Sequence, residues 1–244
     1  MANAYNSKVV ISGDIIEVYE YKNPIVEGYQ EFKKSCSGRS VSASVEDKDI
    51  NRLKVLKRAR RDLRRLINAN INKYGVASKF ITLTFKEHIT TFEVANYEFK
   101  KFRQRLEYFL KFKMKYVVVP EFTKIGRIHF HMLGFNIPYI KNCQFADIWK
   151  NGFIKINCID NVDNVGAYVC KYMNKDILDN RLIGKKCYFA SRGLYKPIEI
   201  KEKERVDNLA VALPSSALSY ESKFQNDYNS IIYKQYNISD IKNK

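Results

Sequence analysis

The stretch that most constrains this chain is residues 116–136, which read YVVVPEFTKIGRIHFHMLGFN. Two runs rich in β-branched and aromatic residues flank a short segment containing Gly126, a pattern typical of a β-hairpin. Alternation along the second strand places His129 and His131 on one face and the apolar residues between and beside them on the other. The chain must therefore contain an antiparallel sheet that presents two imidazoles together.

The turn of this hairpin decides what lies opposite the histidines. A three-residue loop over residues 124–126, with Gly126 in the left-handed conformation, sets one register for the whole hairpin. The resulting cross-strand pairs are Thr123 with Arg127, Glu121 with His129, and Val119 with His131. A loop of even length would instead turn Glu121 to the other face.

The predicted register brings two imidazoles and one carboxylate to one face of the sheet. Such a set suits Mg²⁺, Mn²⁺ or a harder transition ion, and leaves coordination positions open for water and phosphate. The simpler interpretation is a pair of histidines on a solvent-facing strand. The third histidine of the chain, His88, is an alternative ligand, although a plain loop position is the commoner role for such a residue.

Charge indicates the kind of partner. The chain has 43 Lys and Arg against 26 Asp and Glu, a net charge of +17. Residues 199–244 hold seven of each sign, so the whole excess lies in the first 198 residues. Segregated basicity favours a polyanion, most simply nucleic acid. No apolar run is long enough to span a bilayer, and no signal core opens the chain, so we expect a cytoplasmic protein.

A long helix is predicted over residues 44–72, with a leucine- and isoleucine-rich stripe at helical spacing. Eight of the fourteen residues from Arg52 to Arg65 are basic and only Asp62 is acidic. A solvated helix face usually interleaves acids, so this surface favours contact with a phosphate backbone. The candidate DNA-binding residues on this helix are Arg52, Lys57, Arg58, Arg60, Arg61, Arg64 and Arg65. Lys175, later in the chain, is a further DNA-binding candidate.

A second helix of interest is predicted over residues 161–176, which include VGAYVCKYMNKD. At 100° per residue, Tyr168, Lys171, Tyr172 and Lys175 share one arc beside an apolar sector. Tyrosines are frequent in this chain and often fill amphipathic positions. Next to lysines on a basic protein, however, a phenolate is a competent nucleophile toward a phosphodiester, and an ammonium group can neutralise the developing charge.

The remaining segments complete an α+β pattern with a central antiparallel sheet flanked by helices. Three regions are expected: an N-terminal β-hairpin and linker (1–45), a nuclease domain preceded by the basic helix (46–198), and a neutral C-terminal extension (199–244). Further predictions are strands within 8–21, 79–86 and 152–158, helices at 92–112 and 143–149, a helix at 199–208, and strands near 217–224 and 228–236. The residues of the helix at 92–112 available for the core are Tyr97, Phe99, Phe102, Leu106, Phe109 and Leu110. The five scattered cysteines form no CxxC pair and are expected as small core residues.

Three of these segments, in this order, resemble the HUH endonucleases, specifically the rolling-circle replication initiators of small plasmids, phages and circular single-stranded DNA viruses. They are the strand FITLTF (80–85), the HFH motif (129–131) with Glu121 upstream, and VGAYVCKY (165–172). The resemblance covers about residues 50–198. Conjugative relaxases place the tyrosine before the histidines, whereas here the tyrosine follows them.

The resemblance implies an activity as well as a fold. A divalent ion, Mg²⁺ or Mn²⁺, would be held by His129, His131 and Glu121. Tyr168 would attack origin DNA to leave a 5′-phosphotyrosine, Lys171 would assist, and Tyr172 could perform a second cleavage. The implied partner is single-stranded DNA at a replication origin in a bacterial or archaeal host cell. A host helicase, a polymerase or self-association through the neutral tail would fit this role.

Three other functions use the same residues differently. A transposase or relaxase would apply the same chemistry in another genetic setting. A non-catalytic nucleic-acid-binding protein would keep the histidines for structure alone. A metallohydrolase would use water and would be indifferent to both tyrosines.

Overall fold

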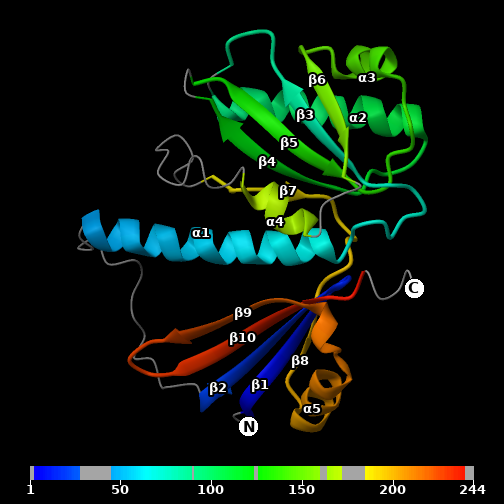
Figure 1. Cartoon of the computed structure of the whole chain (residues 1–244). Helices are drawn as coiled ribbons and strands as arrows, with labels where there is room; N and C mark the ends of the chain where they lie inside the picture. Colours follow the sequence, from blue (N-terminus) through cyan, green and yellow to red (C-terminus); the bar gives the residue numbers. More distant parts are fainter. Residues whose placement is uncertain are drawn as a thin grey trace. The chain divides into compact units, whose positions relative to one another are not determined.

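The computed structural model describes residues 3–27, 45–89, 91–123, 126–159, 164–171 and 185–239, without the side chains of residues 3, 45–49 and 158. These residues form an α+β protein with two five-stranded antiparallel sheets (Figure 1). The chain divides into a terminal unit, residues 1–51 with 196–244, and a central unit, residues 52–195. The α+β class and the antiparallel sheet flanked by helices, both predicted from the sequence, are confirmed.

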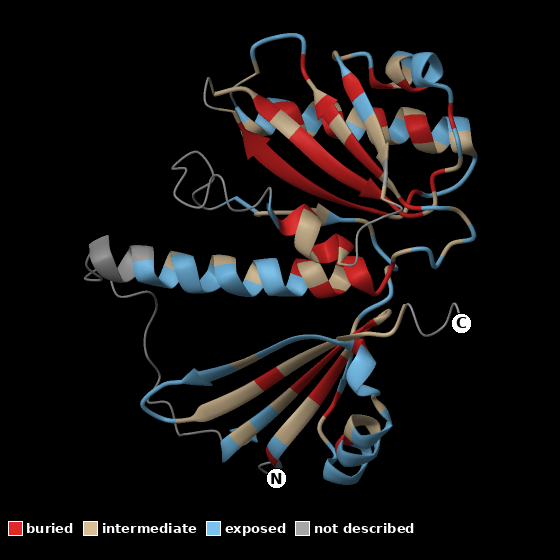
Figure 2. Cartoon of the chain, in the orientation of Figure 1, coloured by how far each residue is buried: buried red, intermediate tan, exposed pale blue. Residues whose placement is uncertain are grey.

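The central unit is built on the hairpin. Its sheet has the strand order β6, β3, β5, β4, β7, with every neighbouring pair antiparallel. The strands span Ile154–Cys158 (β6), Lys79–Thr84 (β3), Ile128–Gly134 (β5), Tyr116–Phe122 (β4) and Phe189–Ala190 (β7). The two hairpin strands lie inside the sheet, and every residue of β4 is buried (Figure 2).

One face of this sheet packs on α2 (Phe92–Leu110) and α3 (Asn142–Trp149). Phe99 and Phe102 of α2 and Trp149 of α3 are buried there against Phe130 and its apolar neighbours on the strands. Burying an aromatic side chain of this kind stabilises a fold by about 1.5–3 kcal/mol. This face is therefore the larger hydrophobic core, and it leaves the opposite face for the histidines.

The opposite face packs on α1 (Val45–Asn68) and α4 (Val165–Cys170). Leu63 and Ile67 of α1 and Val169 of α4 are buried with Phe80 and Val119 of the sheet. Because side chains alternate along a strand, Phe80 and Val119 are on the same face as His131. The tyrosine helix and the last turns of the basic helix thus share a face of the sheet with the histidines.

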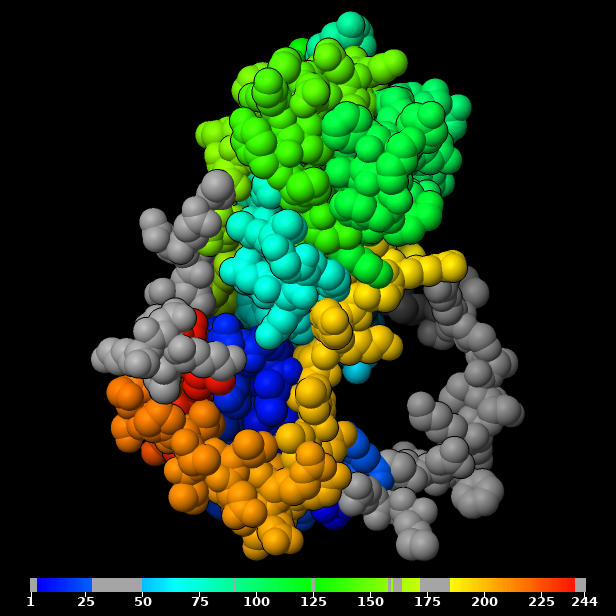
Figure 3. All heavy atoms as spheres, turned by 90° about the vertical axis from the view of Figure 1, so that its right-hand side faces the viewer, coloured from blue at the N-terminus to red at the C-terminus, as the bar shows by residue number. Residues whose placement is uncertain are grey.

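The terminal unit joins both ends of the described chain in one sheet, with the order β8, β1, β2, β10, β9. Its strands span Ile198–Ile200 (β8), Asn3–Ser12 (β1), Ile15–Glu27 (β2), Ser230–Asn237 (β10) and Leu218–Gln225 (β9). Helix α5 (Lys203–Ala212) and a short 3₁₀ helix (Ser215–Ala217) precede β9. Figure 3 shows blue N-terminal and orange-to-red C-terminal residues gathered in this unit. The two end segments, expected as separate regions, are therefore partners in one sheet.

Most predicted elements are present within a few residues, including the first hairpin, which turns at Gly13 with φ of 64°. Their predicted core faces hold only in part. On α1, Leu63 and Ile67 are buried but Leu53 is exposed; on α2, Tyr97 and Phe109 are exposed. Cys170 is buried, whereas Cys143 is exposed, contrary to the core position expected for it. No helix in the described part of the chain has the length and apolar character needed to cross a membrane.

Candidate active site

The turn of the hairpin has the predicted register. The Thr123 amide donates to the Arg127 carbonyl at 2.8 Å, and the Gly126 amide donates to the Thr123 carbonyl at 2.8 Å. Gly126 has a φ of 82°, the left-handed conformation that glycine tolerates best. Glu121 consequently pairs with His129 and Val119 with His131.

The Glu121 carboxylate makes its direct contact with His131, two residues further along β5 than its cross-strand partner His129. Glu121 Oε2 lies 2.5 Å from His131 Nε2, and Thr82 Oγ1 lies 3.3 Å from His131 Nδ1. A carboxylate only accepts, so Nε2 is the donor to Glu121, and Nδ1 of a neutral ring accepts from the Thr82 hydroxyl. The expectation that Glu121 and the two histidines share a face is confirmed, with His131 as the contacting histidine.

His129 occupies the next position on this face and is about half-buried. Burial lowers the pKa of His129, and the neighbouring charges of His131 and Arg127 lower it further, while Glu121 acts in the opposite direction. A depressed pKa keeps the imidazole neutral near physiological pH. Neutral imidazole is the form that binds a metal ion.

Tyr168 is connected to this site through one aromatic side chain. The Phe80 ring stacks on the His131 imidazole, with centroids 5.7 Å apart and an angle of 6° between the planes. The Tyr168 ring meets the Phe80 ring edge-on at 5.7 Å. Lys171 Nζ lies 5.7 Å from the centroid of the Tyr168 ring. The predicted nucleophile, its lysine and the buried histidine are thus brought together around Phe80.

Helix α4 is short, and α1 fixes its position. The Asn164 side chain caps α4 by accepting from the Ala167 amide at 2.9 Å. Asn68 of α1 accepts from the Gly166 amide at 2.8 Å and donates to Asn164 Oδ1 at 3.0 Å. A methyl group on Gly166 would lie 2.3 Å from the Arg64 carbonyl oxygen. Glycine is therefore needed for the two helices to approach this closely.

The donor set fits a divalent ion chemically, because it provides two imidazole nitrogens and one carboxylate on a single face. Among the described residues, however, no three His, Cys, Asp or Glu side chains are arranged to hold an ion. Two of the proposed donor atoms, Glu121 Oε2 and His131 Nε2, contact each other directly. Divalent metal binding, with Mg²⁺ or Mn²⁺, stays a prediction.

Most, but not all, of the predicted DNA-binding side chains of α1 are exposed to solvent. Lys57, Arg58, Arg60 and Arg61 are exposed, and Arg52 and Arg64 are partly exposed. Arg65 is only 7% exposed, so it is not part of the accessible cationic face expected for it. It lies in the last turn of α1, where a cation interacts favourably with the negative end of the helix dipole.

Two predicted site residues, Tyr172 and Lys175, lie outside the described residues. His88, the alternative ligand, is exposed in the loop after β3. Sequence reasoning did not select Phe80, Asn68 or Arg127. Phe80 and Arg127 carried a usable signal, because alternation along β3, and along the hairpin strand continued back to Arg127, puts both on the histidine face. Asn68 carried none, since its partner lies 98 residues away.

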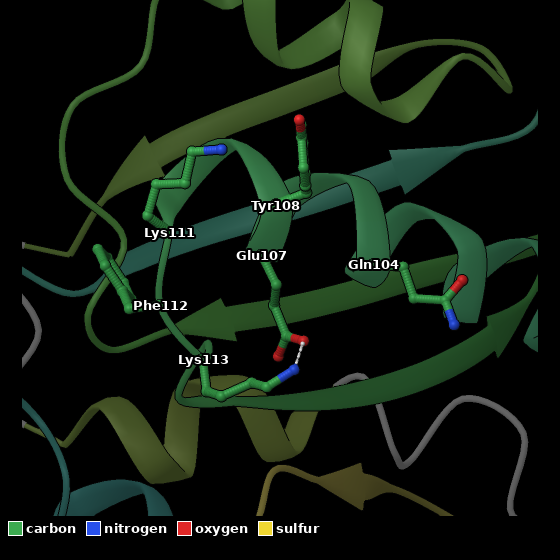
Figure 4. A pocket seen from close by; sticks show the side chains of 6 residues that line it. All are labelled: Gln104, Glu107, Tyr108, Lys111, Phe112 and Lys113. Atoms are coloured by element: carbon green, nitrogen blue, oxygen red, sulfur yellow. Dashed lines mark hydrogen bonds and ion pairs between the residues drawn. The ribbon is translucent and has the colours of Figure 1, made fainter.

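A hollow of about 580 Å³ lies at the C-terminal end of α2, on the helix that packs against the other face of the sheet. Figure 4 shows its lining, Gln104, Glu107, Tyr108, Lys111, Phe112 and Lys113. Lys113 donates to Glu107 at 2.9 Å, and Lys111 Nζ lies 3.9 Å from the centroid of the Tyr108 ring. The hollow contains none of the predicted site residues, so the candidate chemistry lies on the opposite face of the sheet.

Comparison with known proteins finds one family that resembles the segment holding this site. Residues 78–177 match the family described as Replication-associated protein ORF2. The segment contains β3, the histidine hairpin and the described part of the tyrosine helix. The match therefore covers the same part of the chain as the three motifs, and this segment is similar to a replication-associated family.

One curated relative is the phasyl DNA replicon protein arp of Escherichia coli, which is 27% identical. The alignment covers 44% of this chain and 47% of the relative, so the chain spans about half the length of that protein. No solved structure matches this chain.

Proposed function

We propose that this chain is a rolling-circle replication initiator that nicks and rejoins single-stranded origin DNA through a covalent 5′-phosphotyrosine. The observation that carries the proposal is the packing of Tyr168 on Phe80, which itself stacks on His131 beside Glu121. The match of residues 78–177 to a replication-associated family supports the biological setting.

In the proposed reaction the Tyr168 phenol attacks the scissile phosphorus. The tyrosine oxygen forms a bond to phosphorus, the bond to the 3′-oxygen breaks, and the phenol proton leaves to solvent or the departing oxygen. Lys171, 5.7 Å from the ring centroid, stabilises the negative charge on the phenolate and phosphate. Reversal of the same step by a free 3′-OH rejoins the strand, and Tyr172 is proposed for a second cleavage.

A divalent ion held by His129, His131 and Glu121 would supply Lewis acid polarisation of the scissile phosphate. Thr82 holds the other ring nitrogen of His131 and so keeps the imidazole oriented. Phe80 and Val119 keep water away from one side of the site by packing with the helices.

Two labelled forms of one oligonucleotide test the proposal. Single-stranded fragments tiling the replicon that encodes the chain are incubated with the protein and Mn²⁺. A 3′-end label should move to the protein, and a 5′-end label should appear on a shorter fragment ending in a 3′-OH. Tyr168→Phe should abolish attachment of the 3′-end label to residue 168. Tyr108→Phe, on the other side of the sheet, should leave that attachment unchanged.

A non-catalytic DNA-binding role is the second candidate, because the direct Glu121–His131 contact is also what a purely structural pair would form. That role predicts DNA binding with no label transfer from any fragment. A metallohydrolase would shorten the DNA without labelling the protein. If the double variant Tyr168→Phe/Tyr172→Phe still becomes labelled, the tyrosine mechanism is refuted.

A further inference from the structure

Arg127 is fixed at the start of β5 by both of its backbone groups. Its carbonyl accepts from the Thr123 amide at 2.8 Å, and its amide donates to Thr123 Oγ1 at 3.1 Å. Arg127 precedes β5 by one residue, and its bond with Thr123 continues the hairpin pairing, so strand alternation places its side chain on the face of His129. The lowering of the His129 pKa by the Arg127 charge agrees with this proximity.

The guanidinium of Arg127 has an unusual environment. Its Nε is buried and has no hydrogen-bond partner, a condition shared among the described residues only by Ser12 Oγ and Arg103 Nε. Leaving a buried donor without a partner costs about 1–3 kcal/mol, and more for a charged group. Buried polar groups in native proteins nearly always have partners. Arg127, unlike Arg103, lies beside His129, so its missing acceptor points to a ligand of the histidine site.

The chemistry of the group identifies the ligand class. A guanidinium presents several N–H donors in a plane and matches the oxygens of a phosphate, which it can bind in a bidentate manner. A cation ligand is excluded by the charge, and a positively charged donor favours an anionic acceptor over a neutral one. The partner is therefore an oxyanion of the phosphate kind.

We propose that Arg127 binds a backbone phosphate of single-stranded DNA next to His129, and so positions the strand at the histidine site. This inference rests on the proposed function, because it assigns a substrate contact to that site. A phosphodiester on DNA and a free phosphate share the recognised chemistry, and binding measurements distinguish them. The contact precedes any cleavage, so it acts in the absence of metal and of the tyrosine.

The experiment is a titration of the full chain with fluorescein-labelled (dT)20 in EDTA, followed by anisotropy over a series of salt concentrations. Arg127→Gln should weaken binding about 3- to 10-fold and reduce the slope of log K against log salt by about 0.7, the value for one contact to a single strand. Arg127→Lys retains the charge without the planar fork and should keep most of the slope but regain only part of the affinity.

Arg103→Gln is the matched control, because Arg103 has the same unpaired buried Nε but lies on α2 against the other face of the sheet. It should leave affinity and slope unchanged. Equal affinity and slope for the Arg127→Gln and Arg103→Gln variants would overturn the proposal. Full competition of (dT)20 by millimolar inorganic phosphate would assign the site to free phosphate and would also overturn it.

Thermal melting of each variant shows whether it is folded. If Arg127→Gln does not fold, Arg127→Lys gives a second measurement of the same contact. The outcome is separable from that of the nicking proposal, since no cleavage occurs in EDTA. If the label is transferred but Arg127→Gln binds (dT)20 as the parent chain does, only the proposed phosphate contact is refuted. If Arg127→Gln binds more weakly but no label is transferred by the parent chain, only the proposed nicking reaction is refuted.

Discussion

Asn68 of α1 accepts a hydrogen bond at 2.8 Å from the amide of Gly166 in the tyrosine helix. Asn68 lies outside the family-matched segment 78–177, yet it completes the first turn of α4 together with Asn164. Cys170 Sγ makes a further link by donating to the Arg60 carbonyl at 3.3 Å. The helix expected to contact DNA therefore also fixes the position of Tyr168.

Replacing Asn68 by alanine should loosen this connection. The buried Gly166 amide loses its acceptor, and an unsatisfied donor of this kind costs about 1–3 kcal/mol. We expect a lower melting temperature and slower label transfer by Tyr168, with little change in affinity for (dT)20. Gln104→Ala, on exposed surface of α2, is the control and should match the parent chain in both measurements. Unchanged stability and rate for Asn68→Ala would contradict the positioning role.

A methyl group at position 166 tests the same packing by adding volume. The new Cβ of Gly166→Ala would meet the Arg64 carbonyl oxygen at 2.3 Å, and a backbone atom cannot rotate away. Overpacking of this kind costs about 1–3 kcal/mol. Chemical denaturation should report the loss.

Gly134→Ala provides the comparison for that variant. Its Cβ would meet Ile137 Cδ1 at 2.4 Å, the end of a side chain that can change rotamer. We therefore expect a smaller loss of stability than for Gly166→Ala. The reverse order would show that α4 moves away from α1 without penalty.

The two cysteines with opposite exposure should react differently with iodoacetamide. Burial raises the pKa of Cys170 to about 11, so almost no thiolate forms there at pH 8, whereas Cys143 is exposed. Mass spectrometry should find Cys143 labelled in the native chain and Cys170 labelled only after unfolding. Equal labelling of both in the native chain would contradict the tight contact between α1 and α4.

The same shift has a consequence for stability at high pH. The folded chain holds the Cys170 proton more tightly than the unfolded chain, whose thiol has a pKa of 9.0. Its contribution is therefore fully present below about pH 9 and is lost as the pH rises toward 11. Denaturation at pH 8 and pH 10.5 should show this loss, and Cys170→Ser should reduce it.

The parts of the fold governed by local rules could be predicted from the sequence. Gly126 and the length of the turn set the register, and the register placed Glu121 with the histidines. Alternation alone could not reveal that Glu121 contacts His131, because the choice between a directly opposite and a diagonal partner depends on sheet twist and rotamers. Periodicity likewise suggested a buried Tyr97, which proves 57% exposed because α2 buries only the stripe that faces the sheet.

Contacts between distant segments could not be predicted. β1 pairs with β8, and β2 with β10, across about 190 and 210 residues respectively, and no local pattern encodes such pairings. The bond from Gly166 to Asn68 is of the same kind. Arg127 was visible in the sequence, but its significance comes from a buried donor without an acceptor, which only a three-dimensional structure reveals.

Metal binding by the histidine face is the last prediction, and stability measures it without any DNA. An ion that binds only the folded chain stabilises it by about 2.7 kcal/mol at a concentration 100 times Kd. We expect Mn²⁺ to raise the melting temperature, and EDTA to reverse the rise and abolish label transfer.

His129→Ala is the sharper variant, because it removes one nitrogen ligand and leaves the Glu121–His131 contact in place. Its melting temperature should respond little to Mn²⁺, as should that of Glu121→Gln, which removes the negative charge. Glu98→Gln, on α2, should respond as the parent chain does. A full Mn²⁺ response in His129→Ala and Glu121→Gln would place the ion elsewhere on the chain and would remove the histidine face from the proposed chemistry.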